Sequence, residues 1–249
     1  MSKLLLTIRY DGTRFHGWQV QPNGITVQET LQNAVEQITG IRSDITGCSR
    51  TDAGVHAYRF YCTTAMPARL TAEAFRKALN AVLPADVSVL EARQVADDFH
   101  PRYSALGKRY VYRIWNDAVR DPFQYPYAWH IRTPLNHEHM NETAKLFLGT
   151  HDFSAFCSAG SSVKDKVRTI TRSEVTRQGE LVTYTVEADG FLYNMVRILA
   201  GTLLDAAYGK LTAEDISSAL RDGDRQSAGV TAPPQGLFLD QVMYPEETI

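Results

Sequence analysis

Segments typical of strands and of helices alternate along the chain, and this order constrains the fold more than any other feature. Short segments with alternating apolar and polar residues predict strands, while apolar residues spaced three and four apart predict amphipathic helices. The predicted strands are 4–10, 44–48, 58–64, 87–96, 109–115, 167–177, 181–188 and 237–244, and the predicted helices are 26–39, 71–82, 136–148, 191–205 and 212–220. Strand runs with helices on one side favour an α+β fold with a largely antiparallel sheet.

Two of the predicted helices carry clear signals at their ends. Thr26 and Glu29 have the spacing of a capping box at the start of the first helix, and Gly40 follows its last residue. Thr212 and Asp215 have the same spacing at the start of the last helix. The limits of these two helices are therefore predicted more sharply than those of the others.

Composition excludes several classes of protein. The 249 residues are 44% hydrophobic and 22% charged, which is ordinary for a globular protein. No apolar run approaches the roughly 20 residues that cross a bilayer, and the N-terminus lacks a signal-peptide cleavage pattern. We therefore expect a cytoplasmic protein with no membrane partner. Three widely spaced cysteines and the lack of a glycine-rich phosphate loop predict no disulfide framework, no metal and no cofactor.

One loop concentrates chemistry between two predicted strands: Gly47-Cys48-Ser49-Arg50-Thr51-Asp52-Ala53-Gly54-Val55-His56. The small residues around Asp52 let a bulky ligand approach the backbone, and Arg50 favours the ionised carboxylate. An ionised carboxylate held in this way can act as a nucleophile or a general base. The alternative is a turn in which Asp52 bonds to its own backbone and Gly54 supplies a positive φ.

Two basic stretches stand on a chain whose net charge is −2. Residues 99–116 hold four basic and no acidic side chains, and residues 160–178 hold five basic and two acidic ones. Aromatic rings interleave with the first stretch, and rings stack on unpaired bases for roughly 1–3 kcal/mol each. Strand periodicity places Tyr110, Tyr112 and Ile114 on one face, with Tyr112 expected in the core. These stretches favour RNA binding, with solvated strand faces as the alternative.

Arg197 is the only charged residue between Gly190 and Leu204. An arginine in so apolar a helix either extends its guanidinium to solvent or pairs with a buried acid. The sequence leaves both possibilities open.

Together these motifs resemble the TruA family of tRNA pseudouridine synthases over nearly the whole chain. The matching blocks, in the family's order, are Tyr10–Thr13, Phe15, Gly17–Gln19, Val27–Glu29, Gly47–His56, Asp98–Ala105, Lys108–Arg113, Gly149–Phe153 and Phe191–Arg197. Each block alone would be a weak signal, but their joint order and spacing are specific.

The resemblance implies two similar α/β halves that form one extended, mostly antiparallel sheet with helices on one side and a central cleft. Residues 1–98 would carry the aspartate loop, and residues 99–249 would carry Tyr110 and Arg197. It implies an isomerase that converts uridine to pseudouridine at positions 38, 39 and 40 of the tRNA anticodon stem-loop, acting on a flipped base without a cofactor. It also implies a homodimer.

The resemblance assigns roles to individual residues. Asp52 would be the essential carboxylate, Tyr110 would hold the base, Arg197 would pair with Asp52, and Arg50 would hold a phosphate. The residues expected to contact tRNA are Phe99, His100, Pro101, Arg102, Tyr103, Lys108, Gly160, Ser161, Ser162 and Lys164. Whether Asp52 adds to the base, attacks the sugar or removes a ribose proton is left open.

Two rival functions compete with this assignment. A non-catalytic RNA-binding protein would explain the aromatic and basic stretch but would leave the Asp52 loop without a purpose. A hydrolase with Cys48 as nucleophile and His56 as base would lack a third orienting group. The His137-Glu138-His139 segment lacks the helical spacing of a zinc site.

Overall fold

The computed structural model describes residues 3–67 and 70–246. The chain folds as two compact units. Among the described residues, the first unit comprises 3–67, 70–106 and 238–246, and the second comprises 107–237. The division at residue 98 that the sequence predicts for the domains stays a prediction, and each unit is described in turn below.

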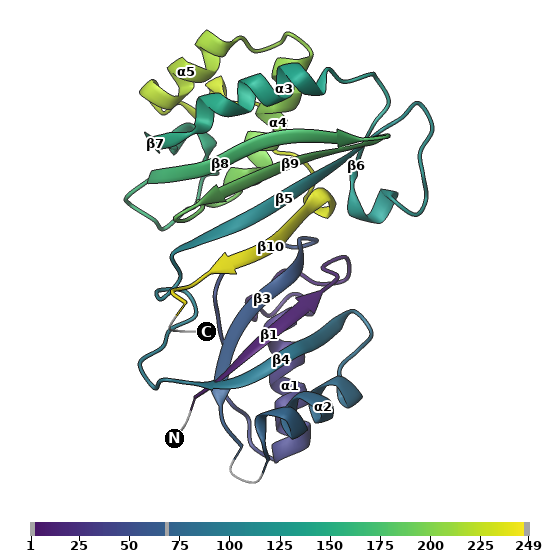
Figure 1. Ribbon diagram of the computed structural model, residues 1–249, viewed down its shortest axis with the longest axis vertical. Coiled ribbons are helices and arrows are strands. Elements are labelled where there is room, and N and C mark those ends of the chain that lie inside the picture. The colour runs from purple at the N-terminus through teal and green to yellow at the C-terminus, as the bar shows by residue number, and fades with distance from the viewer. Residues whose placement is uncertain (1–2, 68–69, 247–249) are drawn as a thin grey trace. The chain divides into compact units, whose positions relative to one another are not determined.

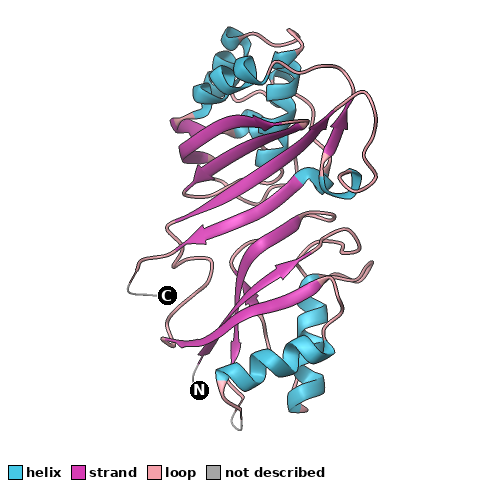
Figure 2. Ribbon diagram, turned by 45° about the vertical axis from the view of Figure 1, so that its right-hand side comes forward, coloured by secondary structure: helices cyan, strands magenta, loops and turns pink. Residues whose placement is uncertain are grey.

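The first unit is a sheet with two helices on one face (Figure 2). Its strands are β1 (Lys3–Tyr10), β2 (Thr46–Gly47), β3 (His56–Ala65), β4 (Val87–Val95) and β10 (Leu237–Met243), and its helices are α1 (Val27–Thr39) and α2 (Ala72–Val82). β1 lies between β3 and β4 and is antiparallel to both. β10 adds to β3 in the parallel sense, with Phe238 opposite His56. The last strand of the sequence thus joins the first unit (Figure 1).

Helix α1 begins and ends where its sequence signals predict. The Thr26 side chain accepts a hydrogen bond from the backbone N–H of Glu29, and Gly40 ends the helix in the left-handed conformation with φ 73°. The N–H of Gly40 donates to the carbonyl of Glu36. Helix α2 begins in the same way, at Thr71.

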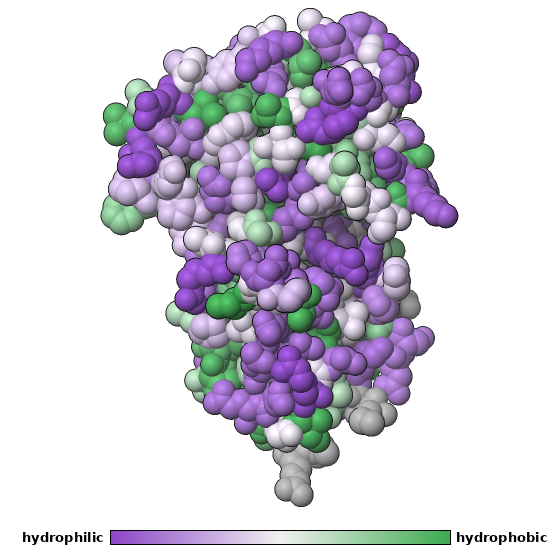
Figure 3. All heavy atoms as spheres, turned by 180° about the vertical axis from the view of Figure 1, so that it is seen from behind, coloured by the Kyte–Doolittle hydropathy of each residue, from purple (hydrophilic) through white to green (hydrophobic). Residues whose placement is uncertain are grey.

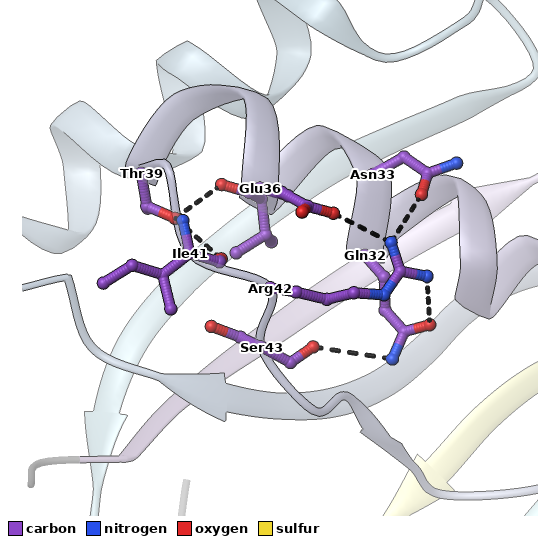
Figure 4. Close-up of polar contacts among 8 residues, drawn as sticks. Gln32, Asn33, Glu36, Thr39, Ile41, Arg42 and Ser43 are labelled. Carbon is purple, nitrogen blue, oxygen red and sulfur yellow. Dashed lines mark hydrogen bonds and ion pairs between the residues drawn. The ribbon is translucent and has the colours of Figure 1, made fainter.

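Arg42 fixes the turn that follows α1 (Figure 4). Its Nη1 donates to Asn33 Oδ1 at 2.9 Å and lies 2.9 Å from Glu36 Oε2. Its Nη2 donates to Gln32 Oε1 at 3.3 Å. These contacts attach the turn to the end of the helix, and so fix the direction in which the chain enters β2.

The second unit is a mostly antiparallel sheet covered by helices. Its strands are β5 (Gly107–Asn116), β6 (Trp129–Ile131), β7 (Gly149–Asp152), β8 (Val167–Gln178) and β9 (Leu181–Ala188), and its α-helices are α3 (His137–Ala144), α4 (Met195–Ala207) and α5 (Ala213–Asp222). β9 lies between β5 and β8, β7 pairs with β8, and only β6 runs parallel to its neighbour, β5. Short 3₁₀ turns occupy 125–127, 145–147, 154–156, 225–227 and 234–236.

The predicted α+β class with a largely antiparallel sheet is confirmed, and the capping box of Thr212 and Asp215 starts α5 as expected. The sequence pattern predicts the start of α4 wrongly. The helix begins at Met195 rather than Phe191 because Asn194 adopts the left-handed conformation, with φ 60°. The short strands β6 and β7 were not predicted, since three or four residues carry too little periodicity.

Each unit buries its own apolar core. In the first unit, Leu4, Leu5 and Leu6 of β1 are almost fully buried on both faces of the sheet. In the second unit, α4 is buried around most of its circumference and packs against α3 and β5. Hydrophilic residues cover most of the surface seen in Figure 3, with hydrophobic residues in small separate patches. In the described part of the chain, every helix is too short or too polar to cross a membrane.

Candidate active site

Asp52 lies in the loop between β2 and β3 of the first unit. Its side chain is half-buried, while Arg50 is exposed. Gly54 has φ 77°, as the sequence predicts for this turn, and the N–H of Val55 donates to the Asp52 carbonyl at 3.2 Å. The loop therefore turns tightly around Asp52.

The segment after β1 holds the Asp52 loop through its main chain. The N–H of Trp18 donates to the Thr51 carbonyl at 3.1 Å, and the N–H of Gly54 donates to the Phe15 carbonyl at 3.2 Å. A third contact joins the Tyr10 hydroxyl to Thr51 Oγ1 at 2.8 Å in a buried position. Three hydrogen bonds thus fix the residues on both sides of Asp52.

Close packing at two glycines brings these segments together. Gly17 has φ 86°, and a Cβ at this position would lie 2.5 Å from the Thr51 carbonyl oxygen. A Cβ at Gly47 would lie 2.6 Å from the indole of Trp18, which stacks on Phe60 at a centroid distance of 4.2 Å. The backbones can approach so closely only because these residues lack side chains.

His56, at the end of the same loop, is buried. Its Nδ1 accepts a hydrogen bond from the N–H of Gly12 at 3.0 Å and lies 3.1 Å from Asp11 Oδ1. Its ring stacks on Phe238 of β10 at 4.6 Å. The Asp11 carboxylate also accepts from the N–H of Thr13, which closes a local turn. These contacts give Asp11 and His56 a structural role in anchoring the loop.

Cys48 does not have the environment of a reactive thiol. It is fully buried, and its sulfur accepts a hydrogen bond from the N–H of Tyr61 at 3.4 Å. Burial also raises the pKa of the neighbouring Cys62 thiol. Nucleophilic cysteines are partly exposed and have a lowered pKa, so this environment disfavours a thiol hydrolase.

The predicted tRNA-contacting segment after β4 has an exposed aromatic and basic surface. The Tyr103 side chain is 77% exposed, and its ring centroid lies 4.3 Å from that of His100. The Arg102 guanidinium lies 5.7 Å from the Tyr103 ring centroid. A ring and a cation that both face solvent suit a base and its phosphate.

Two residues of the same segment are buried beneath this surface. Phe99 is 4% exposed, and its ring lies 5.4 Å from the Tyr244 ring. The Pro101 carbonyl accepts a hydrogen bond from the Tyr244 hydroxyl at 2.6 Å. Phe99 and Pro101 therefore support the segment in this structure, and only its other members present side chains to solvent.

In the second unit, Tyr110 lies on the buried face of β5. Its ring is 6% exposed and meets Phe191 edge-on at 5.0 Å. Tyr112 and Ile114 share this face, as strand periodicity predicts. The Tyr112 hydroxyl donates to the Pro233 carbonyl at 2.8 Å, so the expected core role of Tyr112 is confirmed.

Arg197 is the third residue of α4 and is half-buried. Its Nε donates to the Ala232 carbonyl at 2.7 Å, and its Nη1 donates to Asn194 Oδ1 at 2.8 Å. Burial raises the pKa of Tyr112, and the positive charge of Arg197 opposes this rise only in part. The Ala232 carbonyl and the Asn194 side chain therefore both accept hydrogen bonds from the guanidinium.

The loop at 158–164 starts beside these acceptors. Ser158 Oγ accepts a hydrogen bond from Asn194 Nδ2 at 2.9 Å. Further along, Gly160 has φ 84°, and Gly160, Ser162 and Lys164 are exposed. Ser161 is half-buried, and Lys108 of β5 is half-buried as well.

Sequence reasoning missed residues that support the predicted ones. Tyr10 and Trp18 belong to segments that match the family, but the sequence assigns them no role. Their partner, Thr51, is distant in sequence, so no local pattern reveals the contact. Asn194 directly precedes an apolar helical run, which is the sequence signal of an N-cap, although its side chain binds elsewhere. The roles predicted for Asp52, Tyr110, Arg197 and Arg50, and the tRNA contacts, stay predictions.

Comparison with known proteins finds relatives that match nearly the whole chain. A family profile described as "tRNA pseudouridine synthase" matches residues 6–104 and 143–245. Proteins named tRNA pseudouridine synthase A from Thermoanaerobacter sp. (strain X514) and Geobacter sp. (strain M21) are 44% and 42% identical to this chain. The alignments cover 98% and 99% of this chain and all of each relative.

Among solved structures, one chain of the "Crystal Structure of a Cbf5-Nop10-Gar1 Complex" matches with 12% identity and a TM-score of 0.40. The match covers 96% of this chain and 59% of that chain.

Proposed function

This chain belongs to the tRNA pseudouridine synthase family, and we propose where in the tRNA and with which residues it acts. As a member, it is an isomerase that converts uridine to pseudouridine in tRNA. The proposal adds three elements: the modified positions are 38, 39 and 40 of the anticodon stem-loop, Asp52 is the essential carboxylate, and the target base is flipped out of its stack.

The reaction is an isomerisation, so its atoms balance within the nucleotide and one exchanged proton. The N1–C1′ bond of uridine breaks, the base turns, and a C5–C1′ bond forms. The hydrogen of C5 leaves as a proton, and N1 gains a proton. No oxidant, reductant or water is consumed, so a positioned carboxylate and a pocket for the base are the chief requirements.

The observation that supports Asp52 best is the way its loop is held. A hydrogen bond between the Tyr10 and Thr51 hydroxyls, one from the N–H of Trp18 to the Thr51 carbonyl and one from the N–H of Gly54 to the Phe15 carbonyl restrain both flanks of Asp52. A carboxylate that must act on one atom of a bound base needs such restraint, because small misplacements lower reaction rates steeply.

The family resemblance carries the remaining roles. Tyr110 would place its ring on the flipped uridine, and Arg197 would keep the Asp52 carboxylate ionised and oriented. Arg50, which is exposed, would bind a phosphate near the target nucleotide.

The tRNA contacts form two groups. His100, Arg102 and Tyr103 would stack on a base and bind a phosphate, while Phe99 and Pro101 support them from beneath. In the second unit, Lys108 and the loop at 160–164 would contact the backbone of the tRNA, with Lys164 supplying the positive charge. A homodimer in the cytoplasm completes the proposal.

Mapping the product tests this function directly. Unmodified tRNA transcripts with uridine at 38, 39 and 40 are incubated with the protein, and pseudouridine is located by chemical marking and primer extension. We expect product at these positions, and none in matched transcripts that carry cytidine there. Product at other positions, with none at these three, would contradict the proposal.

A further inference from the structure

The residue before α4 uses its side chain in an unusual way. Asn194 is the N-cap, and an N-cap side-chain oxygen normally accepts a backbone N–H from the first turn. In α4 no such cap bond forms. Instead, Asn194 Oδ1 accepts a hydrogen bond from the Arg197 guanidinium at 2.8 Å. The Asn194 amide therefore binds the Arg197 guanidinium and does not cap the helix.

The other end of the same amide is also occupied. Asn194 Nδ2 donates to Ser158 Oγ at 2.9 Å, and the N–H of Ser158 donates to the Tyr193 carbonyl at 3.1 Å. Because a guanidinium can only donate, the oxygen of the amide must face Arg197 and its nitrogen must face Ser158. The two ends of the amide therefore fix its orientation.

The backbone of Asn194 is adapted to this task. Among the described residues, Asn194 is the only one other than glycine with a positive φ, 60°. Asparagine tolerates this conformation better than most residues, and strained backbone of this kind gathers at functional sites. Arg197 is held from its other side by the Ala232 carbonyl, at 2.7 Å from Nε. Two acceptors thus define the position of the guanidinium.

We propose that Asn194 is a positioning residue for the isomerisation. Its Oδ1 fixes the guanidinium of Arg197, and its Nδ2 links that guanidinium through Ser158 to the loop at 158–164. Since this loop is proposed to contact tRNA, the amide joins substrate binding to the placement of Arg197. The inference rests on the proposed role of Arg197 in catalysis.

Three variants separate the functions of Asn194. Asn194→Gly keeps the left-handed backbone but removes both ends of the amide. Asn194→Asp keeps an acceptor for Arg197 and loses the donor to Ser158. Asn136→Gly is the control, because Asn136 caps α3 with a single side-chain bond, and glycine is tolerated at N-caps.

The test is the rate of tritium release from tRNA that carries 5-tritiated uridine, with concentrations corrected for the fraction of protein that binds tRNA. Asn194→Gly should lower kcat about 10–100-fold and change KM less than about 3-fold. Asn194→Asp should recover kcat to within about 5-fold of the unaltered protein, and Asn136→Gly should leave it unchanged. Unaltered kcat in Asn194→Gly, or equal losses in the Gly and Asp variants, would overturn the proposal.

Ser158→Ala tests the link without changing the helix end. It should lower kcat about 3–10-fold because the amide loses one of its two anchors. Unaltered kcat in this variant would overturn the link to the loop, whether or not Asn194→Gly folds.

A double variant separates this inference from the proposed function. If Asn194 acts through Arg197, Asn194→Gly should cost no further kcat in an Arg197→Ala background, because interacting residues are not additive. Independent, additive losses would overturn the positioning role while leaving the role of Arg197 intact. An Arg197→Ala protein with unaltered kcat would instead overturn the proposed function of Arg197, and this inference with it.

Discussion

The Asp52 loop and the start of α4 are held in place by different means. Around Asp52, main-chain hydrogen bonds between two loops and a close approach at Gly17 provide the restraint. Around Arg197, one backbone carbonyl and one side-chain amide accept from the guanidinium. The first arrangement depends on the absence of side chains, and the second depends on the chemistry of the acceptors.

This difference predicts how each region fails. Adding a Cβ should disturb the Asp52 loop and lower both stability and activity. Exchanging donors or acceptors near Arg197 should lower activity with little change in stability.

The largest contrast is expected between Arg197→Lys and Arg177→Lys. Arg177 has similar partners, since its Nε donates to the Gly179 carbonyl and its Nη1 to Asn116 Oδ1. Lysine keeps the charge but cannot reproduce the planar fork of donors. Arg197→Lys should therefore lower kcat by about 100-fold, while Arg177→Lys should leave kcat nearly unchanged.

Both arginine variants should lose similar stability, measured by urea unfolding. Equal losses of kcat in the two would show that the effect arises from general packing rather than from the position of Arg197.

A second contrast compares two glycines that both have positive φ. Gly17→Ala adds a Cβ against the Thr51 carbonyl and should cost roughly 3 kcal/mol in the free energy of unfolding, with a loss of activity. Gly40→Ala meets no atom within 4 Å and should cost about 1 kcal/mol, with activity retained. Urea denaturation and tritium release measure the two quantities. Equal costs would mean that the close approach at Gly17 is not required.

Local signals in the sequence predict much of the secondary structure, but they do not predict the contacts that hold the Asp52 loop and Arg197. Thr26 and Gly40 define α1 because capping depends on neighbouring residues, and the same holds for Thr212 at α5. The start of α4 was misplaced because Phe191–Asn194 continues the apolar pattern while Asn194 turns left-handed. Only a tertiary contact, here between Asn194 and Ser158, distinguishes the two outcomes.

Removing one buried hydroxyl gives a third, smaller contrast. Tyr10→Phe removes the partner of Thr51 Oγ1 and should cost about 1–2 kcal/mol of stability, with a severalfold loss of kcat. Tyr184→Phe removes a similar buried contact with Ser173 Oγ in the second unit and should cost a similar amount, with kcat unchanged. An equal loss of kcat in both variants would show that the loss does not arise from the contact between Tyr10 and the Asp52 loop.

Replacing the buried thiol near Asp52 should have the smallest effect. Cys48→Ser keeps an acceptor for the N–H of Tyr61, so kcat should stay within about 2-fold of the unaltered protein. Loss of all activity in Cys48→Ser, or complete inactivation by alkylation at Cys48, would favour a thiol nucleophile instead.

The candidate site was only partly predictable for the same physical reason. The residue types of Asp52, Arg50 and Arg197 indicate charge and reactivity, so the sequence can nominate them. These residues are held in place through backbone carbonyls such as those of Thr51 and Ala232. Every residue has a backbone carbonyl, so a sequence pattern cannot show which one accepts the hydrogen bond. The burial of Phe99 beneath the exposed Tyr103 likewise follows from its contact with Tyr244 at the end of the chain.

The most direct test of the central claim, that Asp52 is the essential carboxylate, replaces it with asparagine. Asparagine has nearly the same shape but no charge, so the loop should keep its structure and its affinity for tRNA. Tritium release from 5-tritiated uridine in tRNA should fall by at least about 10³-fold, with the Kd for tRNA changed less than about 3-fold. Tritium release at the rate of the unaltered protein by Asp52→Asn would contradict the account.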